Sequence, residues 1–471
     1  MTAPRLSVVV PVYNERLLVA ELLRRVLALE IEGISELELL VVDDGSRDGT
    51  REILRELARG EPRIRYFEHQ RNGGKGAALR SGIAAATGDL IVVQDADLEY
   101  DPRDYARLVK PFLEDGADVV YGSRFLPSDR RRVLNYRHSL GNRFLTALSN
   151  WFTDLDLTDM ETCYKMFRAQ LLKSIPIRSN DFAIEPEITA KVAKRQLRLF
   201  EVPISYLGRT YQEGKKIGWR DGFKALRAML RFWLIDDLYA EDEYGSHMLH
   251  RIEKVSRFHR WMADRVRPHV GSRVLEIGAG LGEVTQWLMP RERYVAGDVN
   301  PNYLSYLRNF AYGRPYMEVA RVDLEDERTF EELRGRVDTA ICLSVLENVK
   351  DPVQALRNLG GALEPGGTLL VYVPQGPGLF SGLDETLGHR ERYTREGLAS
   401  QLDAAGFELS ECADFNRLAV FWWWLNGRVL GRRTFDRLPL KIFDLLVPLL
   451  RHVDRFLPWR GLGLLAVATK R

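Results

Sequence analysis

Residues 274–288 read VLEIGAGLGEVTQWL, an apolar run that leads into a glycine-rich turn and then into a helical pattern. A strand, a glycine turn and a helix in this order are typical of a layered α/β domain that holds a nucleotide-like ligand at the end of a strand. The pattern begins past the middle of a chain of 471 residues. A chain of this length divides into two or three domains, so we expect a complete domain before the turn.

The spacing in this turn argues against a dinucleotide. The turn follows E-x-G-x-G-x-G, with Glu276, Gly278, Gly280 and Gly282, and a dinucleotide fingerprint would place a glycine where Glu283 stands. A pyrophosphate is also unfavourable beside a carboxylate at a helix start. Glu276 could instead bind a cationic amino group. S-adenosylmethionine carries such a group and has no phosphate. A tight structural turn without a ligand would use the same glycines.

The runs after the turn support a nucleoside ligand. Asp298 ends the next strand-like run about twenty residues on, where an acid binds ribose hydroxyls. Asp323 is placed to accept from an adenine amine, with Leu324 beside it. Five strand-like runs follow one another: RVLEIGAG (273–280), RYVAGDV (293–299), EVARVDL (318–324), DTAICLSVL (338–346) and TLLVYVP (368–374).

Further motifs give these residues a family context. They are VLENVKDP (345–352), LEPGGTLLVYVP (363–374) and the segment 388–409, which begins GHRERYTREGL and ends AAGFEL. Together they resemble class I S-adenosylmethionine-dependent methyltransferases across roughly residues 247–412. That subgroup often has histidine where this chain has Asn348. His389 and Tyr393 are alternative pocket groups, although a single residue of either type is more often a packing residue.

The first 235 residues alternate apolar runs with amphipathic stretches, the pattern of an α/β domain. Residues 6–13, 37–45, 89–97 and 117–124 are strand-like, and residues 15–29, 48–59 and 75–86 have helical periodicity.

Two of these strand-like runs end in acids, Asp43 with Asp44 and Asp95 with Asp97. Two carboxylates at i and i+2 after a strand point to the same side. Asp95 and Asp97 can then share one Mg²⁺ or Mn²⁺ ion. Asp43 and Asp44 could instead cap a turn.

The order of motifs in this half resembles family 2 glycosyltransferases of the GT-A fold, in particular the dolichyl- and polyprenyl-phosphate mannose synthase branch. The motifs are VVVPVYNE (8–15), VVDDGSRDGT (41–50), NGGKGAAL (72–79), QDADLEY (94–100), GSR (122–124), LTDMETCYKMFR (157–168), FAIEPEI (182–188) and GRTYQEGKKIGWRDG (208–222). They cover nearly all of residues 5–235.

The resemblance implies a role for each motif. A nucleoside-diphosphate sugar would be bound by Pro11, Tyr13, Glu15, Asp43, Asp44, Lys75, Asp95 and Asp97. The metal would lie on Asp95 and Asp97, with Glu99 as a third ligand, and would neutralise the departing nucleoside diphosphate.

The acceptor follows from chemistry. A sugar hydroxyl needs a general base, for which Asp159 and Glu161 are candidates. A phosphate monoester, with a second pKa of about 6, is already anionic at pH 7 and needs cations instead. By resemblance a polyprenyl phosphate would face Arg124, Arg137, Arg143 and Arg209, and its charge would also suit Lys215 and Lys216 as extra cations. Arg124 and Arg209 would take part in catalysis, although Arg137 and Arg143 could merely solvate a helix. The Q-x-x-R-W motif of processive sugar polymerases is not found.

We therefore expect residues 1–238 as the glycosyltransferase domain, 239–266 as linker and lead-in helix, and 267–414 as the methyltransferase domain. The tail, 415–471, is rich in aromatic, leucine and basic residues and would be part of that domain, a substrate lid, a membrane-surface element or a dimer interface. The segment 221–236 suits either an interfacial helix or a helix packed on the domain.

Composition limits the remaining choices. A net charge of +2 gives no argument for nucleic acid. Three distant cysteines, Cys163, Cys342 and Cys412, suit a reducing compartment. No signal peptide or apolar stretch of eighteen residues is visible. We expect a cytoplasmic enzyme, peripheral on the membrane, with a homo-oligomer or a membrane-protein partner left open.

Overall fold

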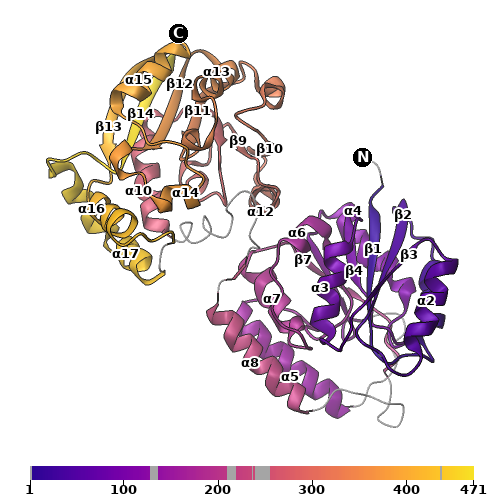
Figure 1. The fold of residues 1–471 in the computed structure, drawn as a ribbon. Helices are drawn as coiled ribbons and strands as arrows, with labels where there is room; N and C mark the ends of the chain where they lie inside the picture. Colours follow the sequence, from indigo (N-terminus) through magenta and orange to yellow (C-terminus); the bar gives the residue numbers. More distant parts are fainter. Residues whose placement is uncertain (1–2, 128–135, 209–218, 236, 239–254, 435–436) are drawn as a thin grey trace. The chain divides into compact units, whose positions relative to one another are not determined.

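The computed structural model describes residues 3–127, 136–208, 219–235, 237–238, 255–434 and 437–471. The chain divides into two compact units, Met1–Ala240 and Glu241–Arg471. Each unit has α/β architecture with helices packed on one sheet (Figure 1). The predicted fold class is therefore confirmed for both halves of the chain.

Within the described residues, the first unit has a seven-stranded sheet in the order β3-β2-β1-β4-β6-β5-β7. β1, β2, β3 and β4 are parallel, while β6 runs antiparallel to both β4 and β5. The carboxyl ends of β1, β2 and β4 therefore meet at one edge, where the acids lie. The strands are β1 (Arg5–Val12), β2 (Glu36–Asp43), β3 (Ile64–Glu68), β4 (Leu90–Val93), β5 (Val119–Ser123), β6 (Lys165–Arg168) and β7 (Leu199–Pro203).

The helices of this unit include the three predicted from periodicity. In α1, Val19, Leu22, Leu23 and Val26 are buried at the spacing of one helix face. The helices are α1 (Val19–Leu27), α2 (Thr50–Gly60), α3 (Lys75–Ala85), α4 (Tyr105–Glu114), α5 (Tyr136–Thr153), α6 (Ala169–Lys173), α7 (Ile184–Lys194) and α8 (Trp219–Leu234). Helices α5, α7 and α8 contact one another, and α5 and α8 lie side by side (Figure 1).

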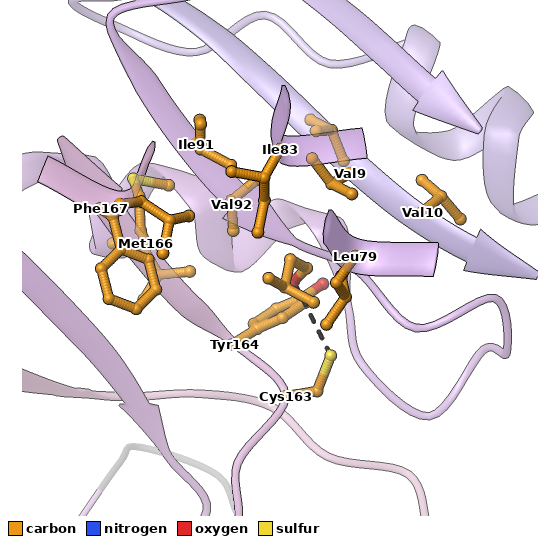
Figure 2. Packing of buried hydrophobic residues seen from close by; sticks show 14 of the residues in the cluster. Val9, Val10, Leu79, Ile83, Ile91, Val92, Cys163, Tyr164, Met166 and Phe167 are labelled. Atoms are coloured by element: carbon orange, nitrogen blue, oxygen red, sulfur yellow. Dashed lines mark hydrogen bonds between the residues drawn. The ribbon is translucent and has the colours of Figure 1, made fainter. Parts of the chain in front are cut away.

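The core of the first unit lies between the central strands and α3. Figure 2 shows Val9 and Val10 of β1, Ile91 and Val92 of β4, and Met166 and Phe167 of β6 close to Leu79 and Ile83 of α3, all of them buried. The near-continuous apolar sequence of β1 is typical of a parallel strand that is covered on both faces. This packing fixes the strand ends that carry the polar residues.

The second unit has a seven-stranded sheet within its described residues, in the order β10-β9-β8-β11-β12-β14-β13. β14 runs antiparallel to both β12 and β13, and the other neighbours are parallel. The strands are β8 (Arg273–Ile277), β9 (Arg293–Asp298), β10 (Met317–Arg321), β11 (Val337–Leu343), β12 (Leu363–Pro374), β13 (Phe407–Phe415) and β14 (Gly463–Lys470).

The helices of the second unit cover this sheet and continue into the tail. The lead-in helix begins at Ser256 in the described part of the chain. The α-helices are α10 (Ser256–Val266), α11 (Thr285–Leu288), α12 (Pro301–Ala311), α13 (Pro352–Ala362), α14 (Gly382–Thr386), α15 (Arg395–Ala404), α16 (Ala419–Trp424) and α17 (Arg437–Val453).

The tail is part of the second unit. Its last strand, β14, lies between β12 and β13 in the sheet, and Leu464, Ala466 and Ala468 of β14 are fully buried. The sequence pattern did not predict β14, because a short apolar run shows no pairing partner until the chain is folded. None of the described helices is long and apolar enough to cross a membrane.

Candidate functional site

The first site is the acidic edge of the first unit. Val12 pairs with Asp43 in the parallel ladder, and the Asp44 amide donates to the Val12 carbonyl at 2.8 Å. Parallel pairing therefore brings the end of β1 beside both acids of β2. β4 pairs with the other side of β1, so Asp95 follows at the same edge.

Asp43 is fully buried and already bound within the protein. Arg51 Nε donates to Asp43 Oδ2 at 3.1 Å, and the Ser46 amide lies 3.3 Å from both carboxylate oxygens. This carboxylate closes the loop between β2 and α2, which agrees with the turn-capping alternative. Its role in binding a donor stays a prediction.

Asp44 organises a second loop. Its carboxylate accepts from the amides of Gly73 and Gly74 at 2.9 and 2.7 Å, and it lies 2.7 Å from His69 Nδ1. Gly74 precedes α3, whose first residue is Lys75. Asp44 therefore acts through the loop that positions Lys75.

Lys75 links two acids at this edge. Its Nζ lies 2.8 Å from Asp95 Oδ1 and 3.2 Å from Glu185 Oε1. Burial opposes both charges, but the contact keeps the pKa of Asp95 low and raises that of Lys75 well above its usual range. Asp95 is therefore ionised at neutral pH. Gln94, which accepts from the hydroxyls of Tyr105 and Tyr164, donates to the Asp95 carbonyl and fixes this chain segment.

The predicted metal ligands are hard oxygen donors, but they do not enclose an ion by themselves. Asp97 Oδ1 accepts from the Glu99 amide at 3.1 Å, and the Glu99 carboxylate accepts from the Tyr206 hydroxyl at 2.6 Å. Among the described residues, no three acids, histidines or cysteines form a group that could hold a metal. Two carboxylates suit a divalent cation only when other ligands complete its coordination shell, so the metal site at Asp95 and Asp97 stays a prediction.

Of the predicted phosphate-binding cations, Arg124 is the best defined. Its guanidinium forms two hydrogen bonds with the fully buried Asp159, at 2.6 and 2.7 Å. Both residues of this pair are thus already partnered. Arg143 is exposed, with its guanidinium 5.5 Å from the ring centre of Phe125. Arg209, Lys215 and Lys216 lie outside the described residues, as does the side chain of Arg137 in α5.

Glu161 is the other predicted base, and it differs from Asp159. Its Oε1 is buried and has no hydrogen-bond partner within the described part of the chain. Burial raises its pKa to about 7, and the negative charge of Glu185 adds to this effect. A carboxyl group with such a pKa can accept or donate a proton near neutral pH.

The loop after β1 lies against the loop after β2. The Asn14 amide donates to Ser46 Oγ at 2.9 Å, and the Glu15 amide donates to Thr50 Oγ1 at 3.0 Å. Tyr13 is 40% exposed and Pro11 is half-buried. These residues stand at the acidic edge, where a planar base could contact them.

The second site is the glycine turn after β8. Gly278, Gly280 and Gly282 have φ angles of 70°, 56° and 78°, a region that disfavours side chains. A Cβ at Gly278 would lie 2.2 Å from Val345 Cγ2, so the turn packs directly against the segment after β11. The turn therefore needs glycine for its backbone shape and, at Gly278, for space.

Glu276 lies in β8 behind this turn. Its Oε2 accepts from the hydroxyls of Thr285 and Tyr294, at 2.5 and 2.7 Å. Burial raises the pKa of Glu276 to about 7. No Lys or Arg is paired with it in the described residues, so a bound ammonium group would favour its ionised form.

Asp298 ends β9 beside the turn, as predicted from the spacing. Its Oδ2 accepts from the Gly280 amide at 3.1 Å and its Oδ1 from the Asn300 amide at 2.8 Å. Burial raises its pKa to about 6. Asp323 and Leu324 follow β10, the next strand beyond β9, and Asp323 is half-buried whereas Leu324 is 3% exposed.

Asn348 and His389 lie near each other. A Cβ at Gly388 would be 3.8 Å from Asn348 Oδ1, and Arg390 Nε donates to the Asn348 carbonyl at 3.0 Å. Tyr393 is buried in the core and donates to the Leu346 carbonyl at 3.3 Å. The structure thus favours a packing role for Tyr393.

The tail covers part of this region. The Arg392 guanidinium lies 4.6 Å from the ring centre of Trp423, and a Cβ at Gly427 would be 2.4 Å from Ser381 Oγ. Helix α16 therefore packs on the segment that contains α14 and His389. The lid, membrane-surface and dimer-interface alternatives for the tail, residues 415–471, stay predictions.

Comparison with known proteins assigns both halves. Glycosyl transferase family 2 matches residues 7–175, and a methyltransferase domain family matches residues 246–411. The chain is a family 2 glycosyltransferase fused to a methyltransferase domain. The first unit is below called the glycosyltransferase unit and the second the methyltransferase unit.

Several curated proteins resemble about half of the chain. An uncharacterized protein of Methanocaldococcus jannaschii is 30% identical over 46% of this chain and 88% of its own length. The undecaprenyl-phosphate 4-deoxy-4-formamido-L-arabinose transferase of Edwardsiella ictaluri is 32% identical, over 44% of this chain and 62% of that enzyme. The polyprenol monophosphomannose synthase of Mycolicibacterium smegmatis is 28% identical, over 45% of this chain and 82% of that enzyme.

Two solved structures align with parts of the chain. Glucosyl-3-phosphoglycerate synthase from Mycobacterium tuberculosis is 21% identical and covers 51% of this chain and 82% of its own, with a TM-score of 0.39. A putative methyltransferase from Bacillus halodurans is 18% identical. The match covers 44% of this chain and 97% of that protein, with a TM-score of 0.32.

Some polar residues of these sites were not assigned from the sequence. Glu185 contacts both Lys75 and the buried Lys165, and the motif FAIEPEI was the only signal for it. In the methyltransferase unit, Asp384 is fully buried and contacts both His389 and Arg392. A single aspartate in a polar loop has no pattern that reveals such contacts.

Proposed function

We propose that the glycosyltransferase unit transfers a sugar from a nucleoside-diphosphate sugar to a polyprenyl phosphate, with inversion at the anomeric carbon. The observation that carries this proposal is the similarity to two relatives whose names describe transferases of polyprenyl phosphates, one matched over 82% of its length. The acidic edge of the unit supports it, since it offers both a carboxylate pair and a lysine for a diphosphate.

In this proposal, Asp95 and Asp97 hold Mg²⁺ or Mn²⁺, which neutralises charge on the leaving nucleoside diphosphate. Lys75, 2.8 Å from Asp95, would lie beside the same oxygens and add positive charge. Pro11, Tyr13 and Glu15 would line the donor pocket. The acceptor phosphate attacks without a base, because it is already an anion at neutral pH.

We also propose that the unit is peripheral on the cytoplasmic face of a membrane. On α8, Ala225, Met229 and Phe232 face the protein, whereas Leu230 and Trp233 are 43% and 50% exposed. The helix therefore packs on the domain and still leaves large apolar side chains outside. Basic side chains on the same helix, Lys224, Arg227 and Arg231, are exposed as well.

The neighbouring helix α5 extends this surface. Its Phe144 and Trp151 are 65% and 84% exposed. A hollow between α5, α7 and α8 is lined by Phe152, Ala190, Met229, Trp233 and their neighbours. An apolar surface with a hollow suits a prenyl chain that must be reached at a lipid boundary.

The test uses the full chain, Mn²⁺, a set of nucleoside-diphosphate sugars and undecaprenyl phosphate in detergent. We expect a lipid-linked sugar, detected by mass spectrometry, with at least one donor. Formation of a labelled oligosaccharide, with no lipid-linked sugar from any donor, would contradict the proposal. Vesicles that contain the lipid should retain the protein in a flotation assay.

A second candidate is transfer to a saccharide hydroxyl, favoured by the unpartnered oxygen and raised pKa of Glu161. Glu161→Gln separates the two, because the amide keeps the shape but cannot act as a base. A hydroxyl acceptor predicts a loss of about 10²–10⁴-fold in turnover. A phosphate acceptor predicts retained activity. Asp156→Asn, at an exposed acid nearby, is the control.

We propose that the methyltransferase unit binds S-adenosylmethionine and methylates a glycan, glycolipid or another small acceptor. Glu276 would bind the amino group, Gly278, Gly280 and Gly282 would approach the ligand, and Asp298 would bind the ribose. Asp323 and Leu324 would contact the adenine. The support is the buried carboxyl pair, Glu276 and Asp298, behind a glycine turn and without a protein cation in the described residues.

The alternative for this half is a docking or regulatory module without catalysis. Calorimetry of the full chain with S-adenosylmethionine tests it, with Asp298→Ala as the binding-site variant and Glu292→Gln, an exposed acid, as the control. We expect binding by the parent and by the control, and weaker binding by Asp298→Ala. Failure of the parent to bind would support the docking module.

A further inference from the structure

A buried polar cluster lies next to the glycine turn and is not used by the binding of S-adenosylmethionine proposed above. Glu347 belongs to a short 3-10 turn, Leu346–Asn348, immediately after β11. Val345, the residue before this 3-10 turn, packs against Gly278 of the glycine turn. Glu347 is only 1% exposed, and its Oε2 has no hydrogen-bond partner within the described part of the chain. A buried, unpartnered carboxyl oxygen is costly, so it indicates a missing ligand.

His389 faces the same carboxyl group. Its Nε2 lies 3.7 Å from Glu347 Oε1, which is longer than a hydrogen bond, and in the described residues Nε2 makes none. The side chain of His389 is 11% exposed, so a small ligand can reach it. Two groups with unused hydrogen-bonding capacity therefore stand side by side.

Asp384 fixes the orientation of the imidazole. His389 Nδ1 lies 3.0 Å from Asp384 Oδ1, and the His389 amide donates to the Asp384 carbonyl at 3.0 Å. Asp384 is in turn held by Arg392 Nε at 2.8 Å. Burial opposes the charge of Asp384, but His389 and Arg392 keep its pKa below the ordinary value. An ionised Asp384 holds the proton on Nδ1 and leaves the lone pair on Nε2.

We propose that His389 is the general base of the methyltransferase unit, that Asp384 is its positioning residue, and that the methyl acceptor is a sugar hydroxyl. The inference rests on the proposed function of this unit. Glu347 would accept a hydrogen bond from, or donate one to, a neighbouring hydroxyl of the same sugar. Two adjacent sugar hydroxyls would suit Glu347 and His389, because each hydroxyl could form a hydrogen bond with one of these side chains. A carboxylate acceptor would need no base, since it is already an anion.

The reaction balances with these residues. The acceptor oxygen uses a lone pair to form the bond to the methyl carbon, and the carbon–sulfur bond breaks with its electron pair left on sulfur. The sulfonium thereby becomes a neutral thioether. The hydroxyl proton moves to His389 Nε2, and the imidazolium is stabilised by Asp384.

The test compares the full-length parent with His389→Gln. S-adenosylmethionine is offered with octyl glucoside, octyl mannoside and octyl galactoside as hydroxyl probes, and with octanoate and octylamine as other acceptors. We expect a methyl ether of a hexoside from the parent and a loss of about 10²–10⁴-fold in kcat for His389→Gln. His452→Gln, at an exposed histidine of α17, should match the parent. Glu347→Gln should raise KM for the hexoside about tenfold with less effect on kcat.

Calorimetry with S-adenosylmethionine is done first, without an acceptor. It separates the failure of the proposed function from the failure of the inference about His389. An absence of binding by the parent overturns the proposed function itself, and this inference with it. If the parent binds S-adenosylmethionine but methylates only octanoate or octylamine, or none of the probes, the hydroxyl acceptor is overturned and the proposed binding of S-adenosylmethionine stands. Turnover by His389→Gln within threefold of the parent overturns the role of His389.

A second readout needs no turnover. Nitrogen-15 resonances of the His389 ring, assigned by comparison with His389→Gln, report which nitrogen carries the proton. We expect the neutral ring to be protonated at Nδ1 and to shift to a mixture of tautomers in Asp384→Asn. Predominant protonation at Nε2 in the parent would overturn the assignment, since that nitrogen could not then accept a proton.

Discussion

The two units place acids at the same kind of sheet edge, but the acids that end their strands differ in whether a lysine or arginine is paired with them. In the glycosyltransferase unit three acids have cationic partners, Asp43 with Arg51, Asp95 with Lys75 and Asp159 with Arg124, whereas Glu161 keeps a buried oxygen without a partner in the described residues. In the methyltransferase unit Glu276 and Asp298 are buried without a Lys or Arg partner in the described residues, and burial raises their pKa values to about 7 and about 6.

The difference matches the charge of the proposed ligands. A nucleoside diphosphate is an anion and needs a metal and a lysine, so the acids that hold them must be ionised beforehand. S-adenosylmethionine has an ammonium group and a sulfonium, so a carboxyl group without a protein cation is free to pair with it. Four predictions test this contrast, and they follow from the largest expected effect to the smallest.

Asp97→Asn should reduce sugar transfer by about 10³-fold, because the metal loses one of its two carboxylates. Formation of lipid-linked sugar at saturating Mn²⁺ measures the effect. Asp115→Asn, at an exposed acid after α4, should leave the rate unchanged. A rate of sugar transfer by Asp97→Asn within threefold of the parent would contradict a metal bound by Asp97.

Asp159→Asn should destabilise the glycosyltransferase unit by about 3–5 kcal/mol, because Arg124 then stays buried without its ion-pair partner. Hydrogen exchange of β5 and β6, followed by mass spectrometry, measures the free energy of opening. Asp156→Asn serves as the exposed control. Unchanged exchange together with lost sugar transfer would instead assign Asp159 to the chemistry.

Glu276→Gln should stabilise the methyltransferase unit at pH 8 by up to about 3 kcal/mol. The pKa of Glu276 is raised from 4.5 to about 7 in the folded chain. Between these values the folded state keeps a proton that the unfolded state has lost, so stability falls as pH rises. The glutamine variant should lose this part of the dependence. Hydrogen exchange of β8 at pH 5 and pH 8, with Glu292→Gln as control, checks it.

Binding of S-adenosylmethionine near pH 7 should release about half a proton, because the ligand ammonium would ionise a carboxyl group whose pKa is close to that pH. Calorimetry in buffers with different ionisation enthalpies measures the release. Glu276→Gln should abolish it and weaken binding. Equal release by parent and variant would assign the proton to another group, such as Asp298.

The comparison also shows how much of each site was visible in the sequence. Asp43, Asp95 and Asp298 were found because parallel strands end at one edge, so the residue after an apolar run already has a known place. Lys75 was named through the family resemblance but not as the partner of Asp95, and Arg51 was not found. Arg51 and Lys75 reach these acids from helices, and helix positions on a polar face show no preference that singles out one cation.

Side chains that come together from distant segments were the hardest to predict. Glu347 and His389 come together only because the segments after β11 and β12 leave the same sheet edge. The strand β14 shows the same limit, since it pairs with β13 across the whole tail. A residue pattern describes local structure, whereas such contacts depend on the register of strands far apart in the chain.

The sequence by itself determined that this chain has two α/β domains, which families they belong to, and which acids end their strands. These features depend on apolar periodicity and on motifs that are local in sequence. Only the tertiary structure decided which acids are neutralised by a cation, that Arg124 is bound to Asp159, and that His389 stands beside Glu347. Charge balance in a buried site depends on distances between side chains, and those are fixed when the sheets and helices pack.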